Sequence, residues 1–309
     1  MGFARDISQR RSLEADLRVS AAAFESQEGM VITDADTQIL KTNQAFTIIT
    51  GYSAQEAMGQ KISMLKSGVH DASFYAEMWS CIKQHGSWQG EIWNRRKTGE
   101  LYPQWLTITA VQDATGEVRN YVGALIDITT RKAIEEQIYH LAHFDALTNL
   151  PNRTLLDDRL QQSLAKAKRE KRKLAVMYLD LDKFKAVNDA FGHDVGDQLL
   201  QEAARRLQAS VKRETDTVCR LGGDEFLILL SSVDVPEDAN IVAEEILQSL
   251  SQTYLHKEHR LSISASIGIA IYPLHGNNAN ALVQNADFAL YQAKHHGRNC
   301  FRYYAGEVK

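Results

Sequence analysis

The chain has 309 residues, which is enough for about two domains of roughly 150 residues each. Its 35 Lys and Arg nearly balance its 39 Asp and Glu, and the net charge of −4 argues against a dedicated nucleic-acid-binding protein. A hydrophobic content of 44% and a charged content of 24% are those of an ordinary folded chain. No apolar run approaches the length of a membrane-spanning helix, so no membrane segment is expected in these residues. The charge balance likewise predicts no nucleic-acid partner.

The cysteines indicate the compartment. Cys81, Cys219 and Cys300 are far apart, odd in number and outside any CxxC pair, which favours a reducing environment. The N-terminus also lacks the apolar stretch of a signal peptide. The sequence therefore predicts a cytoplasmic location.

An internal repeat gives a first indication of domain organisation. Residues 2–11 parallel residues 123–132, because each segment passes from an Asp-Ile-(Ser/Thr) strand end into a basic, helical stretch. We therefore expect residues 1–19 to hold an N-terminal helix and the tail of a preceding domain, within a longer multidomain protein. The sequence leaves open which further domains flank these residues.

The pattern from residue 20 to residue 130 predicts a mixed α+β domain. Residues 30–33 and 38–41 have the alternation of a β-hairpin. Asn43 is placed to cap a short helix that ends at Gly51, and Ser53 begins a capping box that opens the next helix.

A longer helix and a meander follow in the same region. Phe74, Met78 and Ile82 mark one helical face, and that helix is expected to end at Gly86. Three strand-like runs separated by turn sequences come next, at residues 88–95, 101–111 and 118–127.

This order of elements resembles the PAS sensor family. Three short segments strengthen the resemblance, namely Asn43–Phe46, Thr50–Ser53 and Trp88–Glu91. It implies a sensor domain over residues 20–130, built on an antiparallel sheet with short helices. The light-sensing flavin subtype would need a reactive cysteine, and the comparable stretch 62–68 contains none.

The PAS ligand is unknown from sequence. His70 and His85 could ligate haem iron, although isolated histidines near helix ends are more often surface residues. A flavin could stack on one of the four tryptophans, which are Trp79, Trp88, Trp93 and Trp105. A ligand-free dimerisation module is an equally good interpretation.

Residues 131–143 predict a helical linker. Ile134, Ile138 and Leu141 are spaced four and three apart and form one apolar stripe. The stripe is too short to distinguish a dimeric coiled coil from a helix packed on its own domain.

Acidic residues follow a predicted buried strand in the second half of the chain. Residues 174–179 are apolar and lead directly into Asp180 and Asp182. Carboxylates at such a place are costly unless they pair or bind a cation, and hard oxygen ligands suit Mg²⁺. Lys183 then begins a helix, whose free backbone N–H groups favour a phosphate.

A second acidic segment has the pattern of a hairpin. Residues 218–221 and 226–230 are apolar arms around Gly222-Gly223-Asp224-Glu225, so the two acids are expected at the tip. Taken alone, this is also the pattern of an ordinary glycine turn with solvated acids.

Gly222–Phe226 reproduces the signature of the GGDEF family of diguanylate cyclases. Further segments resemble the family's other motifs, at Asp145–Arg153, Asn188–Asp197, Ser266–Ala270, Ala286–Lys294 and Gly297–Asn299. The resemblance covers about residues 140 to 305. It implies that residues 144–309 form a domain with a central, mostly antiparallel sheet flanked by helices, similar to nucleotidyl cyclases and polymerase palms.

The resemblance implies synthesis of cyclic di-GMP and two pyrophosphates from two GTP, in a homodimer that requires Mg²⁺, with Mn²⁺ as the alternative metal. Asp180, Asp224 and the Leu181 carbonyl would hold the metal. Asp224 or Glu225 would take the proton from the attacking hydroxyl, and the sequence leaves open which one acts. The implied substrate contacts are Asn188, His193 and Asp197 for the guanosine part and Lys183, Phe184, Lys185, Lys294 and Arg298 for the phosphates. For His193, a helix-capping role is nearly as good an interpretation.

Regulation is also implied. Arg213 and Asp216 match the family's Arg-x-x-Asp product-inhibition motif, and Arg at such a place can hold guanine or phosphate bidentately. The basic run 166–173 fits a solvated helix end better than a nucleic-acid site. The alternative to an active cyclase is an effector that binds GTP or cyclic di-GMP without turnover.

Overall fold

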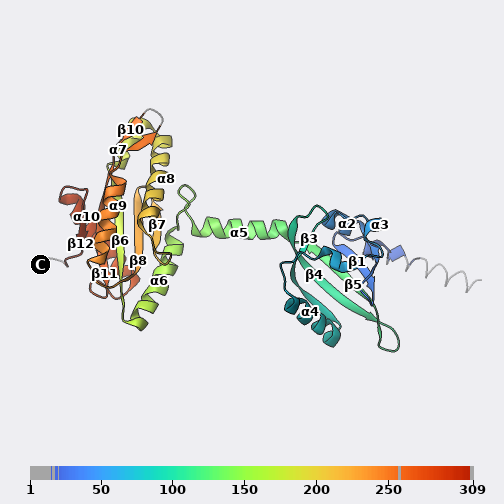
Figure 1. The fold of residues 1–309 in the computed structure, drawn as a ribbon. Helices are drawn as coiled ribbons and strands as arrows, with labels where there is room; N and C mark the ends of the chain where they lie inside the picture. The colour runs from blue at the N-terminus through green and yellow to red at the C-terminus, as the bar shows by residue number, and fades with distance from the viewer. Residues whose placement is uncertain (1–14, 16–17, 20, 257–258, 307–309) are drawn as a thin grey trace, which may run out of the picture. The chain divides into compact units, whose positions relative to one another are not determined.

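The structure is a computed structural model, and it describes residues 15, 18–19, 21–256 and 259–306. The chain folds into two compact units, divided between Glu136 and Gln137, which are treated separately (Figure 1). The repeat and preceding-domain tail predicted within residues 1–19 lie almost wholly outside the described residues.

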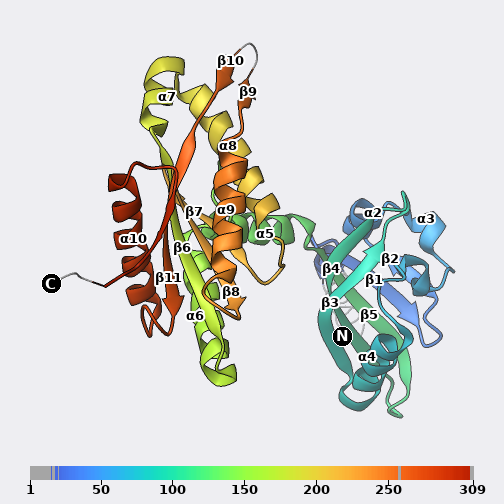
Figure 2. The ribbon, with the colours of Figure 1, turned by 60° about the vertical axis from the view of Figure 1, so that its left-hand side comes forward.

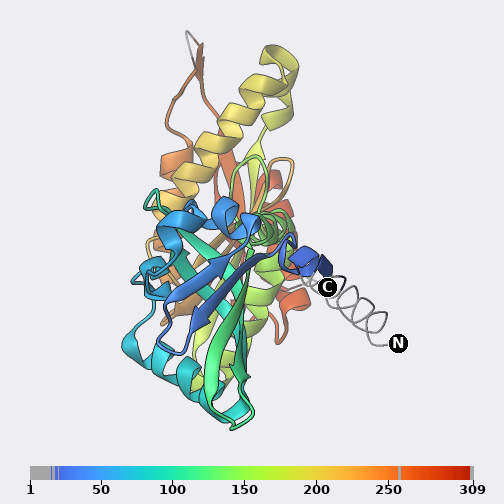
Figure 3. The same cartoon turned by 90° about the vertical axis from the view of Figure 1, so that its right-hand side faces the viewer.

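The first unit is built on a five-stranded antiparallel sheet in the order β2-β1-β5-β4-β3 (Figure 3). The strands are β1 (Gly29–Asp34), β2 (Ile39–Thr42), β3 (Ser87–Arg95), β4 (Leu101–Gln112) and β5 (Val118–Asp127). Between β2 and β3 the chain forms α2 (Gln44–Thr50), α3 (Ala54–Ala57), the 3₁₀ helix η1 (Ile62–Leu65) and α4 (Ala72–His85). The predicted α+β arrangement is confirmed.

Local capping explains where these short helices begin and end. The Asn43 side chain accepts a hydrogen bond from the backbone N–H of Phe46, and Gly51 ends α2 at a φ of 78°. The Ser53 capping box is complete, and Gly86 ends α4 in the left-handed region. The helices cover one face of the sheet with an apolar cluster that includes Val31, Phe46, Leu65, Leu106 and Leu125.

Helix α5 (Thr129–His143) has no buried residue within the described structure. The stripe residues Ile134, Ile138 and Leu141 are 50%, 60% and 65% exposed. The stripe is therefore available to another surface, because the described residues leave it uncovered.

The second unit contains a five-stranded sheet in the order β12-β11-β6-β8-β7. Only the pairing of β11 with β12 is parallel, so the predicted mostly antiparallel sheet is confirmed. The strands are β6 (Lys173–Asp182), β7 (Thr217–Gly222), β8 (Glu225–Val233), β11 (Ser264–Tyr272) and β12 (Phe301–Tyr303), with β9 (Tyr254–His256) and β10 (His259–Leu261) pairing apart.

Helices cover both faces of this sheet (Figure 2). One face packs against α7 (Phe184–Phe191), α8 (His193–Ser210) and α9 (Asp238–Leu250), and the other packs against α6 (Arg153–Glu170) and α10 (Ala279–His295). Central strands buried on both sides explain the long apolar runs in the sequence. No helix in the described part of the chain is both long and apolar enough to cross a membrane.

Candidate active site

The first acidic segment lies within strand β6. The strand continues through Asp182, beyond the apolar run that was expected to end at Leu179, because β11 pairs with it along its whole length. Asp180 and Asp182 are 8% and 4% exposed. Two buried carboxylates at one end of a central strand need compensating partners or a cation.

The second acidic segment meets the first at the tip of a hairpin. Gly222 and Gly223 turn the chain with φ values of 143° and 53°, which L-residues rarely adopt. The turn places Glu225 directly across from Asp180 in the ladder between β6 and β8. The Leu181 backbone N–H donates to the Asp224 carbonyl at 3.2 Å. The structure thus brings Asp180, Leu181, Asp224 and Glu225 together.

Electrostatics distinguish Asp180 within this group. Burial raises the pKa of Asp180, and the nearby charge of Asp224 raises it further. The Lys294 ammonium opposes both effects, because its Nζ lies 2.7 Å from Asp180 Oδ2. A cation is therefore favoured here, and Lys294 of α10 provides one in the structure.

Tyr178 is a member of the site that the sequence analysis missed. Its hydroxyl donates to Glu225 Oε2 at 3.0 Å, which fixes the carboxylate beside the sheet edge. Burial, and then the Glu225 charge, raise the pKa of Tyr178, so the hydroxyl keeps its proton and acts as a donor. In the sequence, a single tyrosine within an apolar run belongs to no motif, so nothing indicated that Tyr178 would contact Glu225.

Asp182 joins three segments at the edge of the site. It accepts hydrogen bonds from the hydroxyls of Ser264 and Ser266 at 2.6 and 2.8 Å and from the Asn299 backbone N–H at 3.1 Å. Its carboxylate therefore holds the end of β6 against β11 and the loop after α10. The Asp-x-Asp pattern was visible in the sequence, but this second acid had been given no role.

A pocket of about 590 Å³ opens beside Asp182. Lys183 and Arg298 both line it, and both have left-handed backbone conformations, with φ of 61° and 63°. Non-glycine residues hold such conformations at an energetic cost that is common at functional sites. Lys183 immediately precedes Phe184, the first residue of α7, so both backbone N–H groups lie at the helix start, and Lys185 is exposed on its first turn.

The expected guanine-contacting residues form a neighbouring group where α7 meets α8. Asn188 Oδ1 is buried and has no hydrogen-bond partner in the described structure. Gly196 lies against it so closely that a Cβ there would stand 1.8 Å from that oxygen. Asp197 and His193 are exposed on the first turns of α8, and His193 follows the N-cap residue Gly192. An unpaired buried amide oxygen is a reason to expect a ligand at this place.

Arg220 is a positioning residue that the sequence analysis also missed. Its guanidinium donates to the Gly223 carbonyl at 3.0 and 2.8 Å and to Asp145 at 2.9 Å, with only 9% of the side chain exposed. Burial by itself raises the pKa of Asp145, but hydrogen bonds from Thr148 and Arg220 outweigh it and lower that pKa. Arg220 thus connects the first loop of this unit to the glycine turn.

Arg213 and Asp216 lie away from these groups, before β7. Arg213 donates to the Ser232 carbonyl at 2.8 Å, and Asp216 accepts from the Ser231 backbone N–H at 2.8 Å and from its hydroxyl at 3.0 Å. Both side chains are therefore held against the end of β8. The basic run ends α6, where Lys171 is the C-cap residue.

The ligands that could bind a hard divalent cation near Asp180 are two carboxylates, those of Asp180 and Asp224, and one backbone carbonyl oxygen, that of Leu181. In the described part of the chain, no three Asp, Glu, His or Cys side chains converge as a ready-made metal site. Two neighbouring carboxylates, one of them buried with a raised pKa, are nevertheless the ligand type that Mg²⁺ prefers, together with substrate phosphates.

The residues discussed for the first unit take different places. His70 stacks on Phe74 with its Nε2 accepting from the Trp93 backbone N–H at 2.9 Å, and His85 is exposed at the end of α4. Of the four tryptophans, Trp79 lines the cavity of that unit. Among the described residues, neither histidine and no cysteine line it.

Together, the two units define a class of protein: a small sensor-like α+β unit joined to a unit that presents paired carboxylates beside a helix start. Residues 142–300 match the family described as the diguanylate cyclase GGDEF domain, and residues 27–130 match the PAS domain family. The chain belongs to the GGDEF family, and its first unit is a PAS domain.

Named relatives agree on the family and differ in activity. The chain is 47% identical over 196 residues to the bifunctional diguanylate cyclase/cyclic di-GMP phosphodiesterase MucR of Pseudomonas aeruginosa, covering 63% of this chain and 28% of MucR. It is 30% identical over 307 residues to the cyclic di-GMP phosphodiesterase PdeR of Escherichia coli, covering 99% of this chain and 45% of PdeR. The chain thus spans less than half the length of each.

Solved structures resemble the second unit. The GGDEF domain of TpbB from Pseudomonas aeruginosa is 39% identical with a TM-score of 0.51, over 52% of this chain and 99% of that one. The coiled coil and GGDEF domain of DgcB from Caulobacter crescentus, solved in complex with c-di-GMP, is 28% identical with a TM-score of 0.52, over 57% and 93%.

Proposed function

We propose that this chain is a diguanylate cyclase that condenses two GTP into cyclic di-GMP and two pyrophosphates. The observation that carries the proposal is the convergence of Asp180 and Asp224 at one sheet edge, where Leu181 donates to the Asp224 carbonyl. The intact Gly-Gly turn and the names of relatives such as TpbB support it. GTP as substrate and the unpaired cysteines favour a cytoplasmic location.

In this proposal the 3′-hydroxyl oxygen of one GTP attacks the α-phosphorus of the other. The new P–O bond replaces the bond to pyrophosphate, and Asp224 or Glu225 accepts the hydroxyl proton. The second, reciprocal attack closes the ring. Tyr178 holds Glu225 at 3.0 Å, so that carboxylate is oriented before the substrate arrives.

The chain's own residues would bind and orient the nucleotide. Asp180, Asp224 and the Leu181 carbonyl would hold Mg²⁺, which supplies charge neutralisation for the triphosphate when bound. The Lys183 and Phe184 backbone N–H groups would bind phosphate, with charge stabilised by Lys185, Lys294 and Arg298. Asn188, Asp197 and His193 would contact the guanosine part, and the unpaired Asn188 oxygen would then gain its missing donor.

A homodimer is part of the proposed mechanism. One unit offers one set of triphosphate ligands, and the attacking hydroxyl belongs to a second GTP, so two units must face each other. Bringing them together removes an entropic cost that is worth several kcal/mol. The exposed stripe Ile134, Ile138 and Leu141 of α5 would pair two copies and let the PAS unit control the reaction. Inserting one to seven residues in α5 should change the rate periodically with helical rotation, whereas a flat series would contradict this control.

The decisive experiment is incubation of the purified chain with GTP and Mg²⁺, followed by chromatography for cyclic di-GMP and a pyrophosphate assay. We expect one cyclic di-GMP and two pyrophosphates per two GTP. Asp224→Asn should lower the rate at least about a hundredfold through the lost charge. The matched control Asp158→Asn, an exposed carboxylate of α6, should leave it unchanged. Pyrophosphate without cyclic di-GMP would contradict the proposal.

A non-catalytic effector is the second candidate. It is favoured by the match to PdeR, which covers nearly the whole chain and is named a phosphodiesterase. In that case the chain would bind GTP or cyclic di-GMP and form no product. Equilibrium dialysis with labelled GTP, run beside the cyclase assay, separates the two.

We further propose product inhibition at Arg213 and Asp216, which the structure anchors at the end of β8. Arg213→Ala should raise the concentration of cyclic di-GMP needed for half-inhibition about tenfold or more. Lys212→Ala, which loses only an ion pair with Glu245, is the matched control. Equal inhibition of both variants would refute this site.

A further inference from the structure

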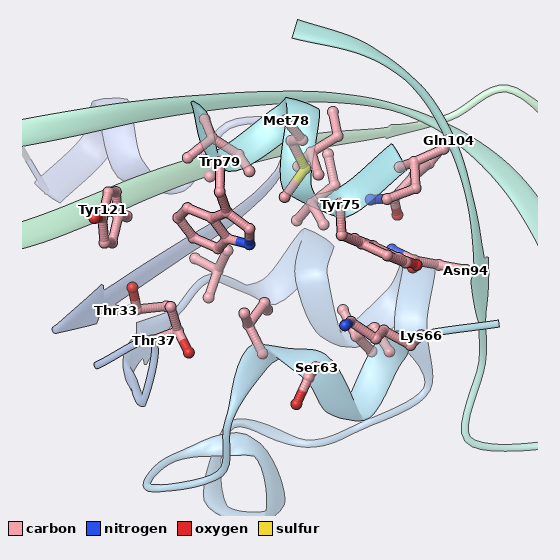
Figure 4. Close-up of a pocket in the computed structure, with 18 residues that line it drawn as sticks. Thr33, Thr37, Ser63, Lys66, Tyr75, Met78, Trp79, Asn94, Gln104 and Tyr121 are labelled. Carbon is pink, nitrogen blue, oxygen red and sulfur yellow. The ribbon is translucent and has the colours of Figure 1, made fainter. Parts of the chain in front are cut away.

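The PAS unit contains a cavity of about 240 Å³ between its sheet and its helices (Figure 4). Six buried apolar side chains are among the residues that line it: Val31, Leu65, Met78, Ile92, Leu106 and Leu125. Tyr75, Met78 and Trp79 reach it from α4, since positions three and four apart share a helix face. The volume equals about eight liquid water molecules, which is small for a cofactor but sufficient for a compact organic ligand.

Two polar side chains, Lys66 and Tyr75, lie together at one side of this cavity. The Tyr75 hydroxyl is buried and has no hydrogen-bond partner in the described structure. Lys66 is exposed at the opening, and its Nζ lies 4.0 Å from the centre of the Tyr75 ring. Within the described ranges Lys66 forms no ion pair with a carboxylate. Burial raises the pKa of Tyr75, so this hydroxyl remains a donor.

Two amide side chains of the cavity wall, Asn94 and Gln104, are already paired. The Tyr102 hydroxyl donates to Gln104 Oε1 at 2.9 Å. With the Asn94 amide oriented so that both of its atoms are paired, it accepts from Gln104 Nε2 at 3.0 Å and donates to the Leu65 carbonyl at 3.0 Å. Lys66 and Tyr75 place a cation beside a buried, unpaired donor at one side of the cavity. Both groups favour a ligand with an anionic oxygen that accepts hydrogen bonds from them.

We propose that this cavity binds a small carboxylic acid with an apolar body, whose carboxylate contacts the Lys66 ammonium and the Tyr75 hydroxyl while its hydrocarbon part fills the apolar wall. A charge-assisted pair and a hydrogen bond satisfy both oxygens of such a head group. The apolar residues gain burial from the body in proportion to its length. A phosphate-bearing cofactor fits less well, because Lys66 is the one cationic side chain among the described residues of the wall.

The test is calorimetric titration of the 309-residue chain with octanoate, hexanoate and octan-1-ol. We expect saturable binding of one octanoate per chain. Hexanoate should bind on the order of tenfold more weakly, because two methylenes remain unburied. Octan-1-ol, with the same tail and no charge, should also bind about tenfold more weakly.

Substitutions assign the head group. Lys66→Gln and Tyr75→Phe should each weaken octanoate binding about fivefold, and Lys66→Gln should also reduce the preference for octanoate over octan-1-ol from about tenfold to about twofold. The matched controls are Lys61→Gln and Tyr52→Phe, which lie in the same unit outside the cavity wall. Lys66 is exposed, so its replacement leaves the fold intact.

Three results would overturn the proposal: no saturable binding of octanoate, equal affinities for octanoate and octan-1-ol, or equal effects of Lys61→Gln and Lys66→Gln. The binding does not rest on the proposed cyclase activity. The Asp224→Asn chain should bind octanoate with an unchanged Kd, so failure of the cyclase assay and failure of this inference are separate outcomes.

Discussion

The two units place polar residues differently on sheets of equal strand number. In the GGDEF unit both faces of the sheet are covered, nearly every residue of β6 and β11 is buried, and the charged groups gather at one strand end. In the PAS unit β3 alternates between exposed and covered positions, and the unmet polar groups face a cavity. In a sheet covered on both faces, acidic residues are easy to recognise in the sequence because they follow long apolar runs. In a sheet covered on one face, polar and apolar residues alternate along each strand, so a polar residue that faces a cavity is not distinguishable by its spacing.

The strongest test of this difference uses two glycines. A Cβ at Gly268 would stand 2.0 Å from the Ala286 carbonyl oxygen, so Gly268→Ala should destabilise the GGDEF unit by about 3 kcal/mol or more. Gly116 has a φ of 84° in open space, and Gly116→Ala should cost the PAS unit only about 1 kcal/mol. All four tryptophans belong to the PAS unit, so their fluorescence reports its unfolding alone.

In urea titrations, Gly268→Ala should shift the circular-dichroism transition and leave the fluorescence transition in place. Gly116→Ala should shift the fluorescence transition instead. If fluorescence follows Gly268→Ala, the two units unfold together and the comparison between them fails.

The next largest effect is expected at Arg220, the buried arginine that contacts the Gly222-Gly223 turn. Arg220→Gln leaves Asp145 and the Gly223 carbonyl short of donors, so it should cost about 2 kcal/mol and lower kcat about tenfold with little change in KM. Arg205→Gln, which breaks only an exposed pair with Glu202, is the control and should change neither quantity. Steady-state kinetics and urea titration of both variants check this, and an unchanged kcat for Arg220→Gln would remove its positioning role.

A smaller effect is expected where α7 meets α8. Gly196→Ala should push Asn188 from its position and raise the KM for GTP about tenfold while the urea midpoint changes little. Gln198→Ala, on an exposed position of the same helix, is the comparison variant. If KM stays constant, Asn188 does not contact the nucleotide.

The smallest effect is a pH dependence shared by the two units. Asp127 pairs with Arg96 at 2.6 Å, as Asp145 pairs with Arg220, and hydrogen bonds lower both pKa values although burial opposes them. A lowered carboxyl pKa adds stability above the unfolded-state value and loses it as the pH falls through the folded value. The free energy of unfolding of the wild type should exceed that of Asp127→Asn or Asp145→Asn by about 1 kcal/mol near pH 7. This difference should shrink below about pH 4. An advantage that grows on acidification would contradict these pairings.

The sequence predicted most of the framework for identifiable reasons. The caps at Asn43 and Ser53 and the turn at Gly222 are local, and local chemistry determines them. Asp224 was recognised through the fixed motif Gly222–Phe226, and Asp180 through its place at the end of an apolar strand-like run. Tyr178 and Arg220 were missed because their roles depend on pairing between strands, and a single tyrosine or arginine has no distinctive spacing. The PAS cavity was missed because its volume results from how apolar side chains pack.

The close approach at Gly268 has a consequence for how the proposed cyclase could be controlled. Helix α10, which carries Lys294, lies directly on the backbone of β11, and β11 is paired along its length with the strand that carries Asp180. The groups proposed for phosphate and metal therefore move as one rigid body. In the proposed homodimer, an incoming signal has little scope to rearrange these groups internally, and it would act most readily by changing how often two complete half-sites meet.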